Sequence, residues 1–500
     1  MHNGKCVKTV AWRRILPTLP GQRQTGTRPI IRLSQFCQKA PIQLGTGQVL
    51  RLDYRLEGHG GSKVSARRGA LPLISEISRL PARGRHHGWS AALLALASLA
   101  ISSGSAAATV AYYDATYRTT FKPGVDHAPV ELKLSGEKLP SKVVLSTDPE
   151  RYRDFRSNDP LEVTDKEVVW RPQGKQASLR YEFIVNHQRS SGSYDSYITQ
   201  NWALFRGDKL TPATRVTAAR KLRSRTTLEF DLPKGWSAVT PYASSGELRF
   251  RVEDPERRFD EPQGWMLVGK IGVRSERIEH VNAVIAAPEG DNARRQDALA
   301  FVNWNLPKLL EVFPDFPKRV LIVSAGDPMW RGGLSGPGSI FLHSQRPLIS
   351  ENRTSPLLHE LVHVALGIRG DPESDWIVEG LAEFYSMQTL RRSGGIGQKR
   401  YEQAVENQKK WAQRAPNLFA KTSTGATTAR AVLVFQEVDA EIRGITKNAA
   451  SLDDVARKLA KERGEVSLTH LQEVAQQVAG KPLQSLQRQR LTKPLVEPGP

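Results

Sequence analysis

The chain contains few cysteines, and both lie near its amino terminus. Cys6 and Cys37 are the only two among 500 residues. The chain after Cys37 therefore has no thiol for a disulfide, a thiolate metal ligand or a cysteine nucleophile. It also offers no cysteine for lipid attachment. An apolar core has to stabilise this part, and any catalysis has to use other side chains.

Apolar runs long enough to span a bilayer are also absent. The stretch from Trp89 to Ile101 has 13 mostly apolar residues, which is too short for a comfortable span. Three arginines precede it, and small residues ending at Ala108 follow. This arrangement is typical of a secretory signal peptide. We therefore expect residues 89–108 to direct export to the periplasm or medium, with cleavage near Ala108. An uncleaved anchor is the alternative.

Acidic residues are scarce at the start of the chain. The first 108 residues hold three acids against 16 lysines and arginines, so they carry +13 of the net charge of +21. Residues 1–88 show no sustained helical or strand periodicity. We interpret them as an Arg-rich leader and hypothesise an over-extended reading frame, with the true start near residue 70–80. A mature protein that retains Cys37 would contradict this. Because most of the basic charge lies in the leader, we predict no nucleic-acid partner.

Residues 109–258 have the pattern of a β-rich domain, a sandwich or a saddle. Short alternating or β-branched runs recur, separated by Pro, Gly, Asn and Asp clusters. The predicted strands are 130–134, 142–145, 167–170, 179–185, 226–232 and 247–252.

Residues 259–424 read as mixed α/β, and residues 425–500 as a helical carboxyl-terminal part. Together with the β-rich domain they predict an α+β multidomain protein. The predicted strands are 265–273, 281–287, 320–324 and 339–343, the last one an edge strand. The predicted helices are 294–313, with Trp304 among its apolar positions, and 427–443, 452–462, 468–478 and 483–491.

His359 and His363 are the most informative residues of the chain. They enclose Glu360-Leu361-Val362 in an H-E-x-x-H segment. Residues four apart lie on the same face of a helix, so both imidazoles can bind one zinc ion. Glu360 lies one position round from the first histidine, where it can take a proton from zinc-bound water. Ser355 can cap this helix, Pro356 suits its first position, and Gly367 or Gly370 can end it.

A third ligand has to come from another part of the chain, because a catalytic zinc takes three protein ligands and one water. A metzincin would place a histidine at position 369, where this chain has Arg369. Glu379 and Glu383 lie four apart on a helix predicted from Trp376, with Asp375 as its cap. Glu379 can bind the metal, while Glu383 accepts a hydrogen bond from a ligating histidine. Asp371, Glu373 and Asp375 are the rival ligands.

These motifs resemble the gluzincins, zinc peptidases in which a glutamate on a following helix completes H-E-x-x-H. Thermolysin and the large aminopeptidase families belong to this group, and the chain is most similar to the glycyl aminopeptidase family. Residues 378–384, VEGLAEF, resemble the family's N/Y-E-G-x-x-E-Y segment. The resemblance extends over about 225–490 and is specific over 355–390. It implies a thermolysin-like catalytic domain, a zinc cofactor and a peptide or protein substrate.

Two positions depart from the family. Its glycine-rich strand carries a glutamate that binds the substrate's amino terminus, and Ser335 stands at that place here. Its tyrosine that donates a hydrogen bond to the oxyanion is replaced by Thr428. Tyr385 should point away from the metal, and His343 is a candidate substitute donor. Aminopeptidase specificity thus loses its physical basis, which favours an endopeptidase or a peptidase with unusual substrates.

The sequence predicts an exported zinc metallopeptidase that hydrolyses peptide bonds with water activated by Glu360. His359, His363 and Glu379 are the predicted metal ligands, and Glu383 is their predicted support. The alternative is a peptidase-like zinc protein with weak or no activity that binds peptides or cell-envelope polymers.

Overall fold

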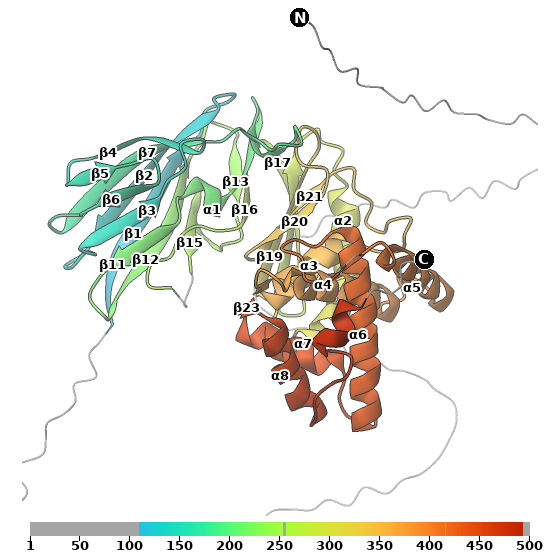
Figure 1. Cartoon of the computed structure of the whole chain (residues 1–500). Coiled ribbons are helices and arrows are strands. Elements are labelled where there is room, and N and C mark those ends of the chain that lie inside the picture. Colours follow the sequence, from blue (N-terminus) through green and yellow to red (C-terminus); the bar gives the residue numbers. More distant parts are fainter. Residues whose placement is uncertain (1–109, 254–256, 416, 494–500) are drawn as a thin grey trace, which may run out of the picture. The chain divides into compact units, whose positions relative to one another are not determined.

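A computed structural model describes residues 110–253, 257–415 and 417–493 (Figure 1). The predicted leader, both cysteines and the predicted signal region lie outside the described residues. Within the described part, no helix combines the length and apolar content needed to cross a membrane. The prediction of an α+β protein is confirmed, because a β-rich region is followed by a mixed region that ends in helices.

The β-rich region runs from β1 to β15 and contains one short helix, α1 (Gly207–Leu210). Every strand predicted in this region is present, with bounds shifted by a few residues. The strands are β1 Ala111–Thr120, β2 His127–Ser135, β3 Lys142–Ser146, β4 Tyr152–Ser157, β5 Leu161–Val163, β6 Glu167–Trp170, β7 Gln176–Ile184, β8 His187–Gln188, β9 Tyr194–Ile198, β10 Trp202–Arg206, β11 Thr214–Thr217, β12 Leu222–Asp231, β13 Ser237–Val239, β14 Ser244–Gly246 and β15 Arg249–Val252.

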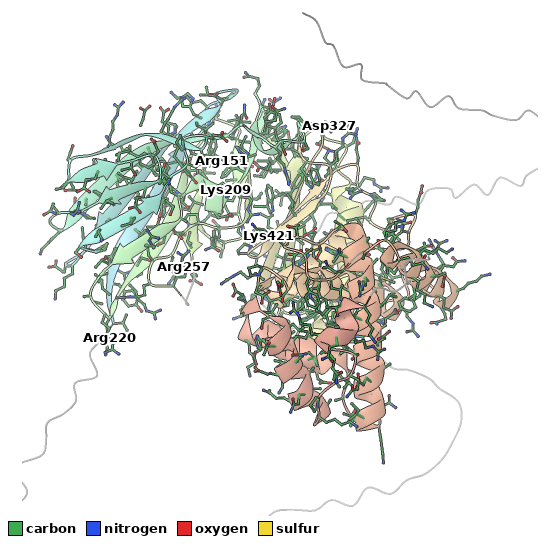
Figure 2. The ribbon with its side chains drawn as sticks, viewed as in Figure 1. Arg151, Lys209, Arg220, Arg257, Asp327 and Lys421 are labelled. Atoms are coloured by element: carbon green, nitrogen blue, oxygen red, sulfur yellow. The ribbon has the colours of Figure 1, made fainter. Side chains whose placement is uncertain are left out.

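Two sheets of this region share one apolar core. The 7-stranded sheet has the order β14-β15-β12-β1-β2-β7-β4, and the 4-stranded sheet has the order β11-β3-β6-β5. Alternate residues point inward, as in Tyr113, Ala115 and Tyr117 of β1, and meet Trp170 of β6 in the same cluster. Arg151, labelled in Figure 2, is buried here and donates hydrogen bonds to Asp195 and Ser196, each at 2.8 Å.

The sheet that carries the site follows. It comprises β17 (Ile271–Ile278), β18 (Val281–Pro288), β19 (Arg319–Ala325), β20 (Gly333–Gly336) and β21 (Ser339–His343), in the order β17-β18-β19-β21-β20. Strands β18, β19 and β21 run parallel, while β20 pairs antiparallel with β21 and forms the edge. The preceding strand β16 (Trp265–Gly269) instead pairs with β10 and β13.

Two strand predictions need correction. The segment 265–273 is not one strand, because the chain turns at Gly269, whose φ of 136° is unfavourable for other residues. The segment 339–343 is a strand but not an edge strand, because β20 lies outside it. The glycine-rich run before it was not expected to form that edge.

The helices follow the predictions in part. The segment 483–491 is helical only from Arg488 onward, and the helix α5 was not predicted. The helices are α2 Arg295–Val312, α3 Pro356–Leu366, α4 Asp375–Arg392, α5 Gln398–Ala412, α6 Gly425–Thr446, α7 Leu452–Glu462, α8 Leu468–Ala479 and α9 Arg488–Thr492, and the short strands β22 Ile368–Gly370 and β23 Gly464–Val466 pair between them.

One apolar cluster joins these helices to a face of the sheet. Leu361 of α3, Trp376 of α4, Phe435 of α6 and Leu471 of α8 belong to it, all with 0% exposure. Trp304 does not, since it is 54% exposed on α2, and its assignment to an apolar position was wrong. Burial around α3 agrees with its apolar sequence and leaves its polar residues in need of partners.

Helix α4 approaches α6 closely at Gly380. A Cβ atom at this position would lie 2.5 Å from Cβ of Ala431 and 2.9 Å from Cε2 of Phe435. A glycine at this position, beside the predicted ligand Glu379, thus allows α4 and α6 to approach closely. This contact fixes α4 against the carboxyl-terminal helices.

We expect Gly380→Ala to lower the free energy of unfolding by about 1–3 kcal/mol, because the added methyl group overpacks the α4–α6 contact. Gly444→Ala is the matched control. Gly444 lies in α6, and a Cβ there would meet nothing within 4 Å, so alanine should stabilise by about 0.5–1 kcal/mol. Urea unfolding measures both. Equal effects in the two variants would contradict the packing described here.

Candidate metal centre

Helix α3 begins and ends where its sequence predicts. The Ser355 hydroxyl accepts a hydrogen bond from the Leu358 amide at 3.2 Å, and Pro356 occupies the first turn. Gly367 ends the helix in the left-handed region, with a φ of 60°. A cap of this kind contributes about 1 kcal/mol. Both ends of the helix that carries the two histidines are therefore held.

Helix α4 begins one residue earlier than predicted. Ser374 is its cap position and Asp375 is its first residue, so Asp375 is not the cap. The Asp375 carboxylate instead accepts a hydrogen bond from the Ser423 amide at 2.6 Å. This bond ties the start of α4 to the segment before α6.

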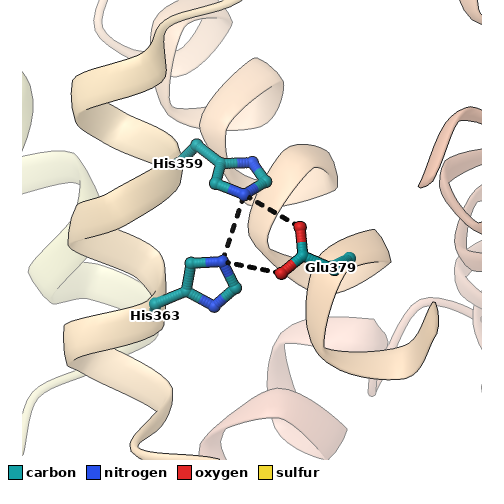
Figure 3. A group of neighbouring side chains, drawn as sticks. All are labelled: His359, His363 and Glu379. Atoms are coloured by element: carbon teal, nitrogen blue, oxygen red, sulfur yellow. Dashed lines mark hydrogen bonds and ion pairs between the residues drawn. The ribbon is translucent and has the colours of Figure 1, made fainter. Parts of the chain in front are cut away.

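Three of the predicted residues converge between α3 and α4 (Figure 3). Nε2 of His359 and Nε2 of His363 lie 3.1 Å apart. One carboxylate oxygen of Glu379 lies 3.3 Å from the former, and the other lies 3.4 Å from the latter. Among the described residues, these three form the one group with ligand geometry for a metal ion.

The distances fit a tetrahedral zinc ion. Ligand atoms at 2.0–2.2 Å from zinc at tetrahedral angles are separated by about 3.3 Å. The two histidine nitrogens, 3.1 Å apart, match this value, and each lies 3.3 or 3.4 Å from a different oxygen of Glu379, so this carboxylate faces both imidazoles. Two imidazoles and one carboxylate are also the donor set of a catalytic zinc, which leaves a fourth position for water. The residues present therefore fit the metal.

The two helices also set the charge of these groups. Burial alone would raise the pKa of Glu379, but hydrogen bonds from His359 and His363 outweigh it and lower the pKa below its usual range. Burial would lower the pKa of His359, yet its bonds to Glu379 and Glu383 raise the pKa well above the usual value. Glu379 is therefore an anion, as a metal ligand must be.

Glu383 lies within hydrogen-bond distance of His359, the residue that it is predicted to support. Its Oε2 lies 3.1 Å from Nδ1 of His359. With Nδ1–H donating to this carboxylate, Nε2 is the nitrogen that would bind a metal, once the proton that it shares with Glu379 is released. Gln408 of α5 lies on the other side of Glu383, with Nε2 3.2 Å from Oε1. The sequence analysis missed Gln408, although Tyr401, Gln408 and Ala412 have helical spacing.

Glu360 lies beside the edge strand. It is 9% exposed, and a Cβ atom at Gly333 of β20 would lie 2.9 Å from its Oε1. Glu360 follows His359 in the sequence, and its carboxylate lies against the backbone of β20. Glu360 does not belong to the group of possible metal ligands among the described residues, and its role as a base stays a prediction.

The rival ligands have other partners. Asp371 accepts a hydrogen bond from the Glu373 amide at 2.9 Å, and Glu373 pairs with Arg488 at 2.8 Å. Neither carboxylate belongs to the metal-ligand group. Asp375, bonded to the Ser423 amide, is also outside that group, so among these four carboxylates Glu379 is the one that lies with both histidines.

His343 is not placed to stabilise an oxyanion. Ile340 and Leu342 of β21 face the cluster that contains α3, whereas Phe341 faces the opposite cluster. Side chains alternate along a strand, so His343 points to the opposite face with Phe341. Its Nε2 lies 3.5 Å from Oδ1 of Asp327, and burial lowers its pKa. This candidate is therefore rejected.

Tyr385, Thr428 and Ser335 lie on three different elements. Tyr385 is fully buried and packs on Phe313 with ring centroids 5.3 Å apart, so it points away from the metal position as expected. Thr428 lies half-buried in the first turns of α6. Ser335 lies on β20 opposite Ile340.

Solved structures with this arrangement of elements are known. An aminopeptidase N family protein from Idiomarina loihiensis matches with a TM-score of 0.54 and 14% identity, over 70% of this chain and 70% of that one. An M1 zinc metallopeptidase from Deinococcus radiodurans matches with a TM-score of 0.50 and 15% identity, over 78% of this chain and 94% of that one. The chain has the M1 metallopeptidase fold. The resemblance to the gluzincins is thereby confirmed at the level of the fold.

Sequence comparison alone does not find this relationship. No protein-family model matches the chain, and no curated protein matches it. At 14–15% identity the likeness to M1 metallopeptidases lies in the fold, so the chemistry of this chain has to be argued from its own residues.

We expect Glu379→Gln to weaken zinc binding by at least about 100-fold, because it removes the anionic ligand. Glu373→Gln should leave affinity within about twofold, since its carboxylate pairs with Arg488. Competition with a chromophoric chelator measures both affinities. Stoichiometric zinc in His359→Ala would disprove the assignment of the site.

Proposed function

We propose that the protein is an exported, zinc-dependent metallopeptidase of the gluzincin type. The observation that carries this proposal is the convergence of His359, His363 and Glu379 into one group that could hold a metal ion. The M1 metallopeptidase fold supports it. When bound, zinc acts as a Lewis acid that polarises a carbonyl and lowers the pKa of water to about 7.

The proposed roles of the side chains follow from their places. His359, His363 and Glu379 hold the metal, and Glu383 orients His359. Glu360 takes a proton from the attacking water and delivers it to the leaving amine. Its burial against β20 keeps its carboxylate close to any substrate that lies along that strand.

The edge strand supports a peptide as the substrate. Strand β20 pairs with β21 on one side and ends the sheet on the other. An extended peptide can add to such an edge through main-chain hydrogen bonds. Because Gly333 contacts Glu360, a peptide bonded to β20 would pass directly in front of the proposed base.

A peptide-binding protein with weak or no activity is the second candidate. Ser335 and Thr428 favour it, because they replace the carboxylate and the phenol that the resemblance leads one to expect. Loss of one oxyanion donor costs about 10²–10³ in rate. The buried Glu360 favours the enzyme, since binding alone requires no general base.

Export is proposed from the sequence of residues 89–108 alone. A short apolar run with a basic flank and a small-residue end is the feature that supports it. Amino-terminal sequencing of the native protein is the direct measurement. A first residue near 109 is expected, and a first residue before the apolar run would contradict export by this route.

We expect wild type and Glu360→Gln each to hold one zinc ion, while only the wild type cleaves a peptide library. Removing the general base should lower kcat by at least about 10²-fold, because proton transfer contributes about 10²–10⁴. Metal analysis and mass spectrometry of the peptides give the two readouts. If both proteins hold zinc and neither cleaves any peptide, the binding function is correct and the enzyme proposal fails.

We also expect acetylation of a substrate's amino terminus to change kcat/KM by less than about tenfold. The segment from Pro328 to Ser350 contains no acidic residue that could bind a free amino group. A lost charge-assisted bond would otherwise cost about 1.5–3 kcal/mol. Matched free and acetylated peptides test this. A drop of more than 100-fold on acetylation would show that another carboxylate binds the amino terminus.

A further inference from the structure

A third helix reaches the proposed metal centre through Gln408. Gln408 lies on α5, is 2% exposed and directs Nε2 to Oε1 of Glu383 at 3.2 Å. The other oxygen of Glu383 lies 3.1 Å from Nδ1 of His359. Side chains of α5, α4 and α3 thus form one continuous line that ends at a proposed zinc ligand.

The orientation of the Gln408 amide is fixed by its neighbour. An ionised carboxylate only accepts hydrogen bonds, so the amide has to turn its NH2 group toward Glu383. A flipped amide would place two oxygen atoms against each other. The geometry therefore specifies donation from Gln408 to Glu383.

The amide is kept at an energetic cost. Its Oε1 is buried and has no hydrogen-bond partner among the described residues, and burial of an unpaired polar atom is unfavourable. A methionine would fill the same volume beside Met387 without this cost. Packing alone therefore does not explain a glutamine at position 408, whereas the bond to Glu383 does.

We propose that Gln408 is a positioning residue of the metal centre, an inference that rests on the proposed zinc site. Its N–H holds one oxygen of Glu383, so that the other oxygen stays in place to accept from Nδ1 of His359. That bond directs the Nε2 lone pair of His359 at the metal. Gln408 does not belong to the group of three possible metal ligands and would act on it through Glu383.

The same pair of helices offers a matched control. Gln388 of α4 donates a hydrogen bond to the Tyr401 hydroxyl of α5 at 2.9 Å. This bond also links α4 to α5 through a glutamine, but it does not involve Glu383. A role in helix packing alone would make the two glutamines equivalent.

Zinc affinity is measured by chelator competition on the full chain as wild type, Gln408→Met and Gln388→Met. We expect Gln408→Met to weaken zinc binding by about 10–100-fold and to shift the visible spectrum of the cobalt-substituted protein. Gln388→Met should leave both unchanged. Thermal unfolding in chelator shows whether each variant is folded. If Gln408→Met does not fold, Gln408→Asn keeps an amide that is too short to reach and should weaken binding in the same direction.

A double-mutant cycle tests the route through Glu383. In the background of Glu383→Gln, Gln408→Met should cause less than about a twofold further loss of zinc affinity. Additive losses, or equal losses in Gln408→Met and Gln388→Met, would overturn the positioning role. So would an unchanged affinity and cobalt spectrum in Gln408→Met, with the proposed function intact. A wild type that binds no zinc would overturn the proposed function itself.

Discussion

The packing of α3 against α4 is the constraint on which the rest of the structure depends. Each helix presents two polar residues to the other, His359 and His363 from α3, and Glu379 and Glu383 from α4. These groups are mostly buried, and each would destabilise the fold without its partner. A small shift of one helix along the other would move the carboxylates of Glu379 and Glu383 away from the imidazoles. The centre therefore requires that both helices be held from outside.

The surrounding elements provide that hold. Gly380 lets α6 approach α4 at a distance that no larger residue allows, and Asp375 ties the start of α4 to the Ser423 amide. The apolar residues of α3 and α4 belong to one cluster with the sheet and the carboxyl-terminal helices. The helices after residue 425 thus share their core with the two helices that carry His359, His363 and Glu379.

The local part of this structure could be predicted from the sequence, and the non-local part could not. Helix α3 has a cap, a proline and a terminating glycine within 13 residues, so its signals lie in the chain itself. The same holds for the pairing of Glu379 and Glu383 on one face. Whether β21 lies at the edge of its sheet depends instead on whether β20 pairs with it, and no local sequence pattern determines that pairing. Helix α5 was missed because its buried face includes a glutamine, whose partner lies on another helix.

The contact between Gly333 and Glu360 restricts which residue the edge strand β20 can carry at position 333. The Glu360 carboxylate lies against the main chain at Gly333, so a side chain at position 333 would displace it. Leu334 and Ser335, the next two residues of β20, can vary without displacing that carboxylate. On the proposed function, the residues of β20 beside a bound peptide could therefore change the choice of substrate while the Glu360 carboxylate kept its place against Gly333.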